Sequence, residues 1–234
     1  VSLYFEEEPI FSCLTAAACA TEETESVSGD SYSFLETDDS VAMILSDGVG
    51  SGESAARDSG RIVDLTERIL DAGLGPDMAM LFLNGMAGAE GDENRMATLD
   101  LCRIDLYRGE CETVKAGGAA GFIKRSDRVE KIQSRQLPLG MSASEDISEK
   151  KWQLNSGDLV ILVSDGVVQN WPCGDGEYLL EQKIASLNVS SPVDLANLIL
   201  RYAIRQCGGK IRDDMTVLVT GIWKNEEREI EDIE

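Results

Sequence analysis

The spacing of apolar residues changes period several times along the chain and predicts blocks of strands and helices. Apolar or alternating runs typical of strands occur at residues 11–20, 31–36, 41–45, 97–107, 111–116, 121–125, 129–132, 152–154, 159–163 and 215–223. Apolar residues recur every three or four positions, as on one helix face, at residues 51–72, 76–86, 178–186 and 192–207. Residues 85–92 show no clear period, and we expect a loop there.

Residues with special backbone preferences mark the helix ends. Gly73 follows the first helix, where glycine commonly ends a helix. Pro76 and Pro192 each suit the first turn of a helix, and Ser191 lies in the position of an N-cap. These signals fix the predicted helix bounds more firmly than the apolar spacing does.

Short polar turns separate many of the predicted strands. Turns at residues 37–39, 108–110, 126–127 and 155–158 each connect two strands, and strands joined in this way pair antiparallel. The strands cluster apart from the helices, which favours an α+β fold with mostly antiparallel sheets over alternating βαβ units. No internal linker interrupts the 234 residues, so we expect one domain with a core at about 10–223 and a mobile acidic tail at 224–234.

The charge balance narrows the classes of partner. The chain has 21 Lys and Arg against 43 Asp and Glu, a net charge of −22. Nucleic acid is excluded as a partner, because its affinity comes mainly from cations that neutralise phosphates. Most of the carboxylates are interpreted as solvated groups that keep the chain soluble.

Two residue types limit the chemistry. The chain contains no histidine, and its six cysteines form no C-x-x-C pair, which argues against zinc sites and excludes Ser-His-Asp or Cys-His catalysis. Several cysteines lie in apolar segments, where reduced and buried thiols are expected, and this favours a cytoplasmic location. No apolar run reaches the roughly 20 residues that cross a bilayer. Because the chain begins at Val1, inside an ordered segment, we expect an excised domain, and any membrane anchor or targeting element would then lie outside it.

Two segments of the chain repeat one pattern. Residues 42–49 and 160–167 are each a buried strand followed by Ser-Asp-Gly. Either copy alone is more often a simple turn. Both strands are too apolar for a sheet edge, and within one sheet they would bring Asp47 and Asp165 side by side at a common rim. Such carboxylates repel one another unless a cation neutralises them, and Mg²⁺ and Mn²⁺ prefer oxygen ligands. Gly48 leaves its carbonyl accessible as a further ligand.

Two other acidic positions fit the same rim. Asp30 ends a Ser-Gly-Asp turn directly before a strand, and Asp213 and Asp214 precede the last strand. Taken alone, Asp213 and Asp214 are as well explained as solvated residues that cap a strand. The four positions together favour a metal site.

The order of these motifs resembles the metal-dependent (type 2C, PPM) protein phosphatases, and among them the phosphatase domains of bacterial sporulation. The matching stretches are Ser28–Tyr32, Asp47–Gly52, Ala97–Leu101, Lys115–Gly117, Leu137–Gly140 and Arg212–Thr216. The resemblance runs from about residue 11 to residue 223 and implies an α-β-β-α sandwich of two mostly antiparallel sheets flanked by helices. In that fold, metal ions lie in the cleft between the sheets.

The resemblance also implies the site and its reaction. Asp47 would bridge two Mn²⁺ or Mg²⁺ ions, with the carbonyl of Gly48 as a further ligand. The other implied ligands are Asp165, Asp213 (the first residue of its acidic pair) and Asp30, the last acting directly or through water. The two ions would activate a shared water to hydrolyse a phosphoserine, so Asp47 and Asp165 are the residues most needed for turnover.

The resemblance implies a substrate as well, namely a phosphoserine on an anti-sigma-factor antagonist in sporulation control. The visible chain would then be the cytoplasmic domain of a membrane-anchored protein. The chain departs from larger phosphatases of this class because no arginine near its start could clamp the phosphate. Phosphate recognition would therefore rest on the metal ions, which favours docking of a whole partner protein.

Two other interpretations use the same residues. Residues 50–55 satisfy a G-x-G-x-x-A dinucleotide-binding pattern, which we reject because Asp47 would face a pyrophosphate and because hairpins follow. A regulatory or scaffolding module, with the phosphatase fold but with lost or partner-dependent catalysis, stays open.

The helices at 51–86 suggest a means of control. Three glycines connect Asp47 to the first of them, and both helices have apolar faces that either pack on the sheet or move as a lever. The resemblance favours the lever and a homodimer through these helices. We therefore expect Ile62 and Ile69, far from any ligand, to be regulatory positions.

Overall fold

The computed structural model describes residues 8–89, 97–133, 136–141, 149–169, 171–172 and 175–225. The strands are β1 (Phe11–Ala20), β2 (Asp30–Glu36), β3 (Ser40–Asp47), β4 (Leu99–Asp105), β5 (Glu110–Ala116), β6 (Gly121–Lys124), β7 (Val129–Ile132), β8 (Lys150–Gln153), β9 (Leu159–Val163) and β10 (Met215–Lys224). The helices are α1 (Gly52–Asp71), α2 (Pro76–Ala89), α3 (Gly176–Ser186) and α4 (Pro192–Gln206), with a 3₁₀ turn at Asp165–Val167. Of the acidic tail predicted at 224–234, only Lys224 and Asn225 belong to the described residues.

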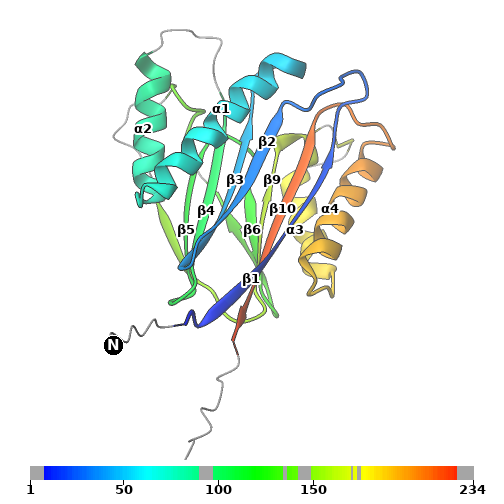
Figure 1. Ribbon diagram of the computed structural model, residues 1–234. Coiled ribbons are helices and arrows are strands. Elements are labelled where there is room, and N and C mark those ends of the chain that lie inside the picture. Colours follow the sequence, from blue (N-terminus) through cyan, green and yellow to red (C-terminus); the bar gives the residue numbers. More distant parts are fainter. Residues whose placement is uncertain are drawn as a thin grey trace, which may run out of the picture.

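Two antiparallel sheets pack face to face, and helices cover both outer faces (Figure 1). Sheet A has the strand order β1-β10-β9-β6-β7, and sheet B has the order β2-β3-β4-β5-β8. Helices α3 and α4 pack on sheet A, whereas α1 and α2 pack on sheet B. The predicted α-β-β-α sandwich is confirmed.

Three apolar layers hold the sandwich together, because each sheet is buried on both faces. Side chains such as Leu180 and Ile199 pack helices α3 and α4 on sheet A. Met43 and Leu162 belong to the layer between the sheets, and Val63 belongs to the layer under α1 and α2. Burial on both faces explains why β3 and β9 are continuous apolar runs and not alternating ones.

The arrangement of β3 and β9 corrects one prediction. The apolar character of both strands suggested that they share a sheet, but β3 lies in sheet B and β9 in sheet A. A continuous apolar run shows that a strand is covered on both faces, and in a sandwich each sheet meets that condition. Asp47 and Asp165 therefore approach one another from opposite sheets and not along a single rim.

Three of the four predicted hairpins are confirmed, and one is wrong. β2 pairs with β3, β4 with β5, and β6 with β7. β8, however, pairs with β5 in sheet B, whereas β9 pairs with β6 and β10 in sheet A. Residues 155–158 thus carry the chain from one sheet to the other.

Helix α2 is longer than its apolar spacing predicted. It continues to Ala89, so the loop expected at 85–92 is wrong for residues 85–89, and residues 90–92 lie outside the described residues. Gly85 and Gly88, near the end of this helix, weaken the helical pattern in the sequence. Tertiary packing compensates: Leu83 is fully buried, and the side chain of Asn84 accepts a hydrogen bond from the backbone N–H of Gly140 at 2.9 Å.

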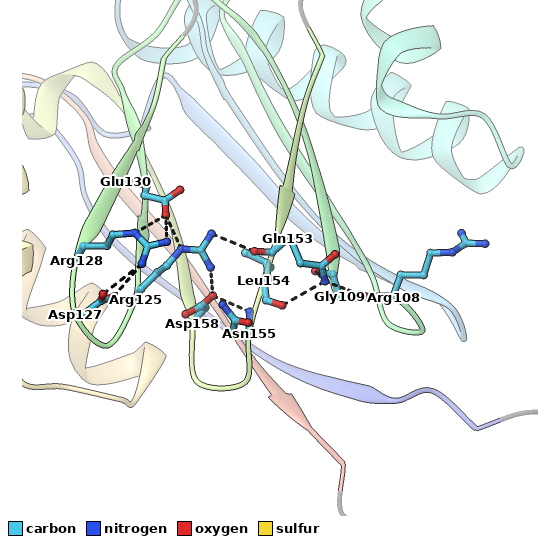
Figure 2. Close-up of polar contacts among 10 residues, drawn as sticks. All are labelled: Arg108, Gly109, Arg125, Asp127, Arg128, Glu130, Gln153, Leu154, Asn155 and Asp158. Atoms are coloured by element: carbon cyan, nitrogen blue, oxygen red, sulfur yellow. Dashed lines mark hydrogen bonds and ion pairs between the residues drawn. The ribbon is translucent and has the colours of Figure 1, made fainter.

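A buried ionic cluster fixes the crossing between the sheets (Figure 2). The guanidinium of Arg125 contacts the carboxylates of Asp158 at 2.5 Å and Glu130 at 2.7 Å, and it donates to the carbonyl of Gln153 at 3.1 Å. The Asp158 carboxylate also accepts the backbone N–H of Asn155 at 2.8 Å. The cluster joins the β6–β7 hairpin to the segment that changes sheets.

Replacing Arg125 by leucine should therefore lower the free energy of unfolding by about 3 kcal/mol or more, because it leaves the buried carboxylate of Asp158 without its cation. Chemical denaturation measures this loss. The matched control is Arg128→Leu, whose side chain is 55% exposed while it contacts the same Glu130. An exposed pair contributes less than about 1 kcal/mol, so equal losses in the two variants would contradict the assignment.

Candidate metal centre

The five acidic residues singled out in the sequence lie at strand ends on two sheets, and four of them are the predicted ligands. Asp30 opens β2 and Asp47 ends β3, and the two residues are direct partners across the strand pair. Asp165 opens the 3₁₀ turn after β9, and Asp213 lies two residues before β10. Asp165 and Asp213 influence the pKa of Asp47, so sheets A and B both contribute to one group of charges. Gly48 directly follows Asp47 and bridges to Ala97.

Asp30 is the most buried of these four. It is 9% exposed, and neither carboxylate oxygen has a hydrogen-bond partner in the described part of the chain. The pKa of Asp30 is raised to about 7, mainly by burial; the nearby hydroxyls of Ser164 and Thr216 oppose the rise, and the charges of Asp214 and Asp165 add to it. A buried carboxylate without partners is costly unless a cation or a proton neutralises it.

Burial and like charge also affect two other carboxylates of the group, Asp47 and Asp213. Burial raises the pKa of Asp47 to about 9, with further contributions from the charges of Asp30, Asp165 and Asp213. Burial also raises the pKa of Asp213, and the charge of Asp165 adds to that effect. Such a group can bind a hard divalent cation, which would replace the protons.

Glycines allow the backbone segments of the site to approach one another closely. A Cβ atom on Gly48 would overlap with the carbonyl oxygen of Ala55 in α1, and one on Gly166 would overlap with the carbonyl oxygen of Asp214. Helix α1 therefore lies directly against the segment that follows Asp47. Any side chain at these two positions would push the acidic segments apart.

The two neighbouring acids before β10 have different environments. Asp214 is 6% exposed, and its two carboxylate oxygens accept the backbone N–H groups of Glu22 at 2.9 Å and Gly29 at 2.6 Å. Asp213 is half-buried, and one of its oxygens accepts the backbone N–H of Asp214 at 2.9 Å. Backbone N–H groups thus bind both carboxylate oxygens of Asp214, which leaves Asp213 as the candidate ligand of this pair.

Further residues of the site were missed in the sequence. The side-chain amide of Gln169 donates to Asp165 at 2.6 Å, and the hydroxyl of Thr98 accepts the backbone N–H of Asp47 at 2.9 Å. Gln169 follows Asp165 by four residues, so its contact depends on the 3₁₀ turn, for which the sequence carried no recognised signal. Thr98 contacts Asp47 only because β4 pairs with β3.

The donor set suits Mn²⁺ or Mg²⁺, because it consists of carboxylate and carbonyl oxygens without sulfur or imidazole. The unpartnered oxygens of Asp30 and the cross-strand pair Asp30–Asp47 fit such an ion. Within the described ranges, no three acidic, cysteine or histidine side chains are already arranged to hold an ion together. The carboxylates nevertheless converge from both sheets.

The two helix positions nominated as regulatory lie on α1. Ile62 and Ile69 are both half-buried and pack against the layer between α1, α2 and sheet B. Ile62 also lines a small pocket with Leu83 and Met86 of α2. Neither residue belongs to the acidic group.

Comparisons with known proteins agree with this architecture. The family described as Stage II sporulation protein E (SpoIIE) matches residues 37–222. Stage II sporulation protein E of Bacillus subtilis (strain 168) is 36% identical over 213 residues, which cover 90% of this chain and 26% of that protein. Phosphoserine phosphatase RsbU of the same organism is 24% identical over 200 residues, covering 82% of this chain and 59% of that protein.

A solved structure has the same fold. The PP2C phosphatase domain of B. subtilis SpoIIE, solved with a fragment of its regulatory domain, superposes with a TM-score of 0.87 at 34% identity and covers 93% of this chain and 65% of that chain. The fold and these similarities define a protein phosphatase domain of the PP2C type. Within that class, the chain belongs to the SpoIIE family. It spans about a quarter of the length of the B. subtilis relative.

Proposed function

We propose that this domain hydrolyses phosphoserine on a partner protein with two Mn²⁺ or Mg²⁺ ions in the cleft between the sheets. Asp47 would bridge the ions with the carbonyl of Gly48, while Asp165 and Asp213 complete one of them and Asp30 supports the site. The convergence of these carboxylates from both sheets, with the buried oxygens of Asp30 lacking partners, carries the proposal.

Bound divalent cations lower the pKa of water, orient a phosphoryl group and offset its negative charge. The protein residues hold this arrangement in place. Gln169 donates to Asp165 and fixes the orientation of that carboxylate, and Thr98 fixes the backbone of Asp47. The first basic residue of the chain is Arg57, so the segment that contains Asp30 and Asp47 supplies no cation for the phosphate.

The proposed substrate is a phosphoserine on an anti-sigma-factor antagonist in sporulation control. Similarity to SpoIIE and to the phosphoserine phosphatase RsbU supports it. We also propose that the domain is the cytoplasmic part of a membrane-anchored protein. In the part of the chain that the structure describes, no helix has the length and apolar character needed to cross a membrane.

Phosphate release from a panel of phosphoserine proteins, measured with added Mn²⁺, tests the function and its specificity. We expect the phosphorylated antagonist protein to be turned over faster than unrelated peptides that also contain one phosphoserine. Equal rates on all of them would contradict the proposed substrate, and absence of turnover on every one would contradict the phosphatase function.

A conditional enzyme is the second candidate, and the exposed apolar residues of α2 favour it. In this form a partner, or a second copy of the chain, docks on α1 and α2 and brings the site into metal-binding register. Helix α2 exposes Leu81, Phe82 and Met86, an apolar face suited to a homodimer. Ile62 and Ile69 would link that face to the site.

Substitutions at Ile62 or Ile69 should then change the dependence of turnover on metal. For Ile62→Ala we expect the Mn²⁺ concentration at half-maximal rate to shift several-fold, because the substitution alters the packing of α1 on α2. Turnover measured against Mn²⁺ concentration gives this midpoint, with Ile184→Val as a control in the α3 layer. If every variant keeps the wild-type midpoint, the two helices only support the fold.

A further inference from the structure

The backbone of Gly29 is a hydrogen-bonding centre beside the acidic site. Its N–H donates to the carboxylate of Asp214 at 2.6 Å. Its carbonyl accepts the hydroxyl of Ser59 at 2.6 Å and the backbone N–H of Gly48 at 3.3 Å. The two peptide groups that flank the Gly29 Cα thus join the segment after Asp213, the segment after Asp47 and helix α1, and Gly29 directly precedes Asp30.

The contact with helix α1 is buried and specific. Ser59 is fully buried, and its hydroxyl also lies 2.8 Å from the hydroxyl of Ser31, on the other side of Asp30. A Cβ atom on Gly29 would lie 3.0 Å from the Cβ of Ala55, so α1 packs closely against the backbone of Gly29. Ser59 therefore contacts the chain on both sides of Asp30 without contacting its carboxylate.

We propose that Asp214 and Ser59 are positioning residues of the metal site, which act through the backbone N–H and carbonyl of Gly29 and bind no ion themselves. Asp214 holds the Gly29 N–H from sheet A, and Ser59 holds the carbonyl from α1. Together they set the position of Asp30 relative to Asp47 and Asp213. This inference rests on the proposed metal-dependent function.

The chemistry of the two residues supports different contributions. The carboxylate of Asp214 binds two backbone N–H groups, and hydrogen bonds to a charged acceptor are stronger than neutral ones. Ser59 supplies a neutral hydrogen bond, so its removal leaves the charge of the site unchanged. A loss of metal affinity in Ser59→Ala would therefore report a change of position and not of electrostatic potential.

The test measures the Mn²⁺ dissociation constant by titration calorimetry, alongside the melting temperature. Ser59→Ala should weaken Mn²⁺ binding about fivefold, as expected for one lost buried hydrogen bond. Thr66→Val is the matched control: Thr66 is also fully buried in α1, but its hydroxyl donates to the carbonyl of Ile62 in its own helix. We expect this control to lower the melting temperature and keep the wild-type dissociation constant.

Asp214→Asn should weaken Mn²⁺ binding at least about tenfold. Glu22→Gln controls for charge, because the charge of Glu22 acts on Asp213 while its side chain takes no part in holding Gly29. In the double variant, the effect of Ser59→Ala should largely disappear, because both residues hold the backbone of the same residue, Gly29.

Additive effects of Ser59→Ala and Asp214→Asn, or equal losses in Asp214→Asn and Glu22→Gln, would overturn the positioning role. A wild-type dissociation constant in Ser59→Ala would also overturn it, even where the wild-type chain binds Mn²⁺ and releases phosphate as proposed. If the wild-type chain bound no Mn²⁺, both the proposed function and the positioning role would fall together.

Discussion

Asp47→Asn and Asp165→Asn should each reduce phosphate release at least about a hundredfold, which corresponds to several kcal/mol of lost charge stabilisation. The two carboxylates approach from opposite sheets, so neither has a neighbour on its own strand that could replace it. Rates of phosphate release at saturating Mn²⁺ measure the loss. Asp38→Asn, in the exposed turn between β2 and β3, is the control and should retain wild-type turnover.

The same substitution at Asp47 should stabilise the metal-free chain near neutral pH. Because the pKa of Asp47 rises from 3.8 to about 9 on folding, its folded form binds a proton that the unfolded form releases. This contribution is fully present below pH of about 4 and is lost as the pH rises through about 9. Asparagine carries no charge and avoids that loss.

Thermal melting of the metal-free proteins at several pH values checks this expectation. Wild-type stability should fall between pH 5 and pH 9 by more than that of Asp47→Asn. Earlier melting of Asp47→Asn at every pH would show that Asp47 supports the fold and would remove the main reason for the metal site.

Local patterns were sufficient for most individual elements. Strands β1, β7 and β9 have the bounds that their apolar runs predicted, and helix α4 has the predicted cap, with the Ser191 hydroxyl accepting the backbone N–H of Asp194. The pairing of Asp30 with Asp47 could also be derived from the sequence, because the short turn of the β2–β3 hairpin fixes its register.

The arrangement of the sheets could not be derived in this way. Asp165 belongs to the sheet opposite Asp47 because β10 pairs with β1 and β9, a contact between the two ends of the chain. No local pattern encodes such a contact. The segment at 155–158 has an ordinary turn composition, yet it crosses between the sheets because Arg125 and Asp158 anchor it.

Two stretches that carried the family resemblance have a structural role that their sequence did not reveal. Asp100 and Lys115 are cross-strand partners on β4 and β5, and their charged atoms lie 2.5 Å apart in the interior. Burial raises the pKa of Asp100 to about 6, and Lys115 opposes this rise. Similarly, the difference between Asp213 and Asp214 depends on backbone groups of Glu22 and Gly29, far away in the sequence.

Excess EDTA should abolish phosphate release, and this is the largest effect that we expect. All implied ligands are oxygen atoms, and no histidine in the chain could act as a base or accept a proton without a metal. Added Mn²⁺ should restore the rate, and Mg²⁺ should restore it less well.

The chelation experiment separates the metal from the fold. Circular dichroism in EDTA should show unchanged secondary structure, because the three apolar layers and the Arg125 cluster hold the sandwich without the site. Asp47→Asn gives a matched control, since its residual rate should be insensitive to EDTA. Once the metal is removed, the buried carboxylates hold protons, and the phosphoryl group has no cation to bind. Full turnover of the wild-type chain in excess EDTA would therefore exclude a metal-dependent reaction.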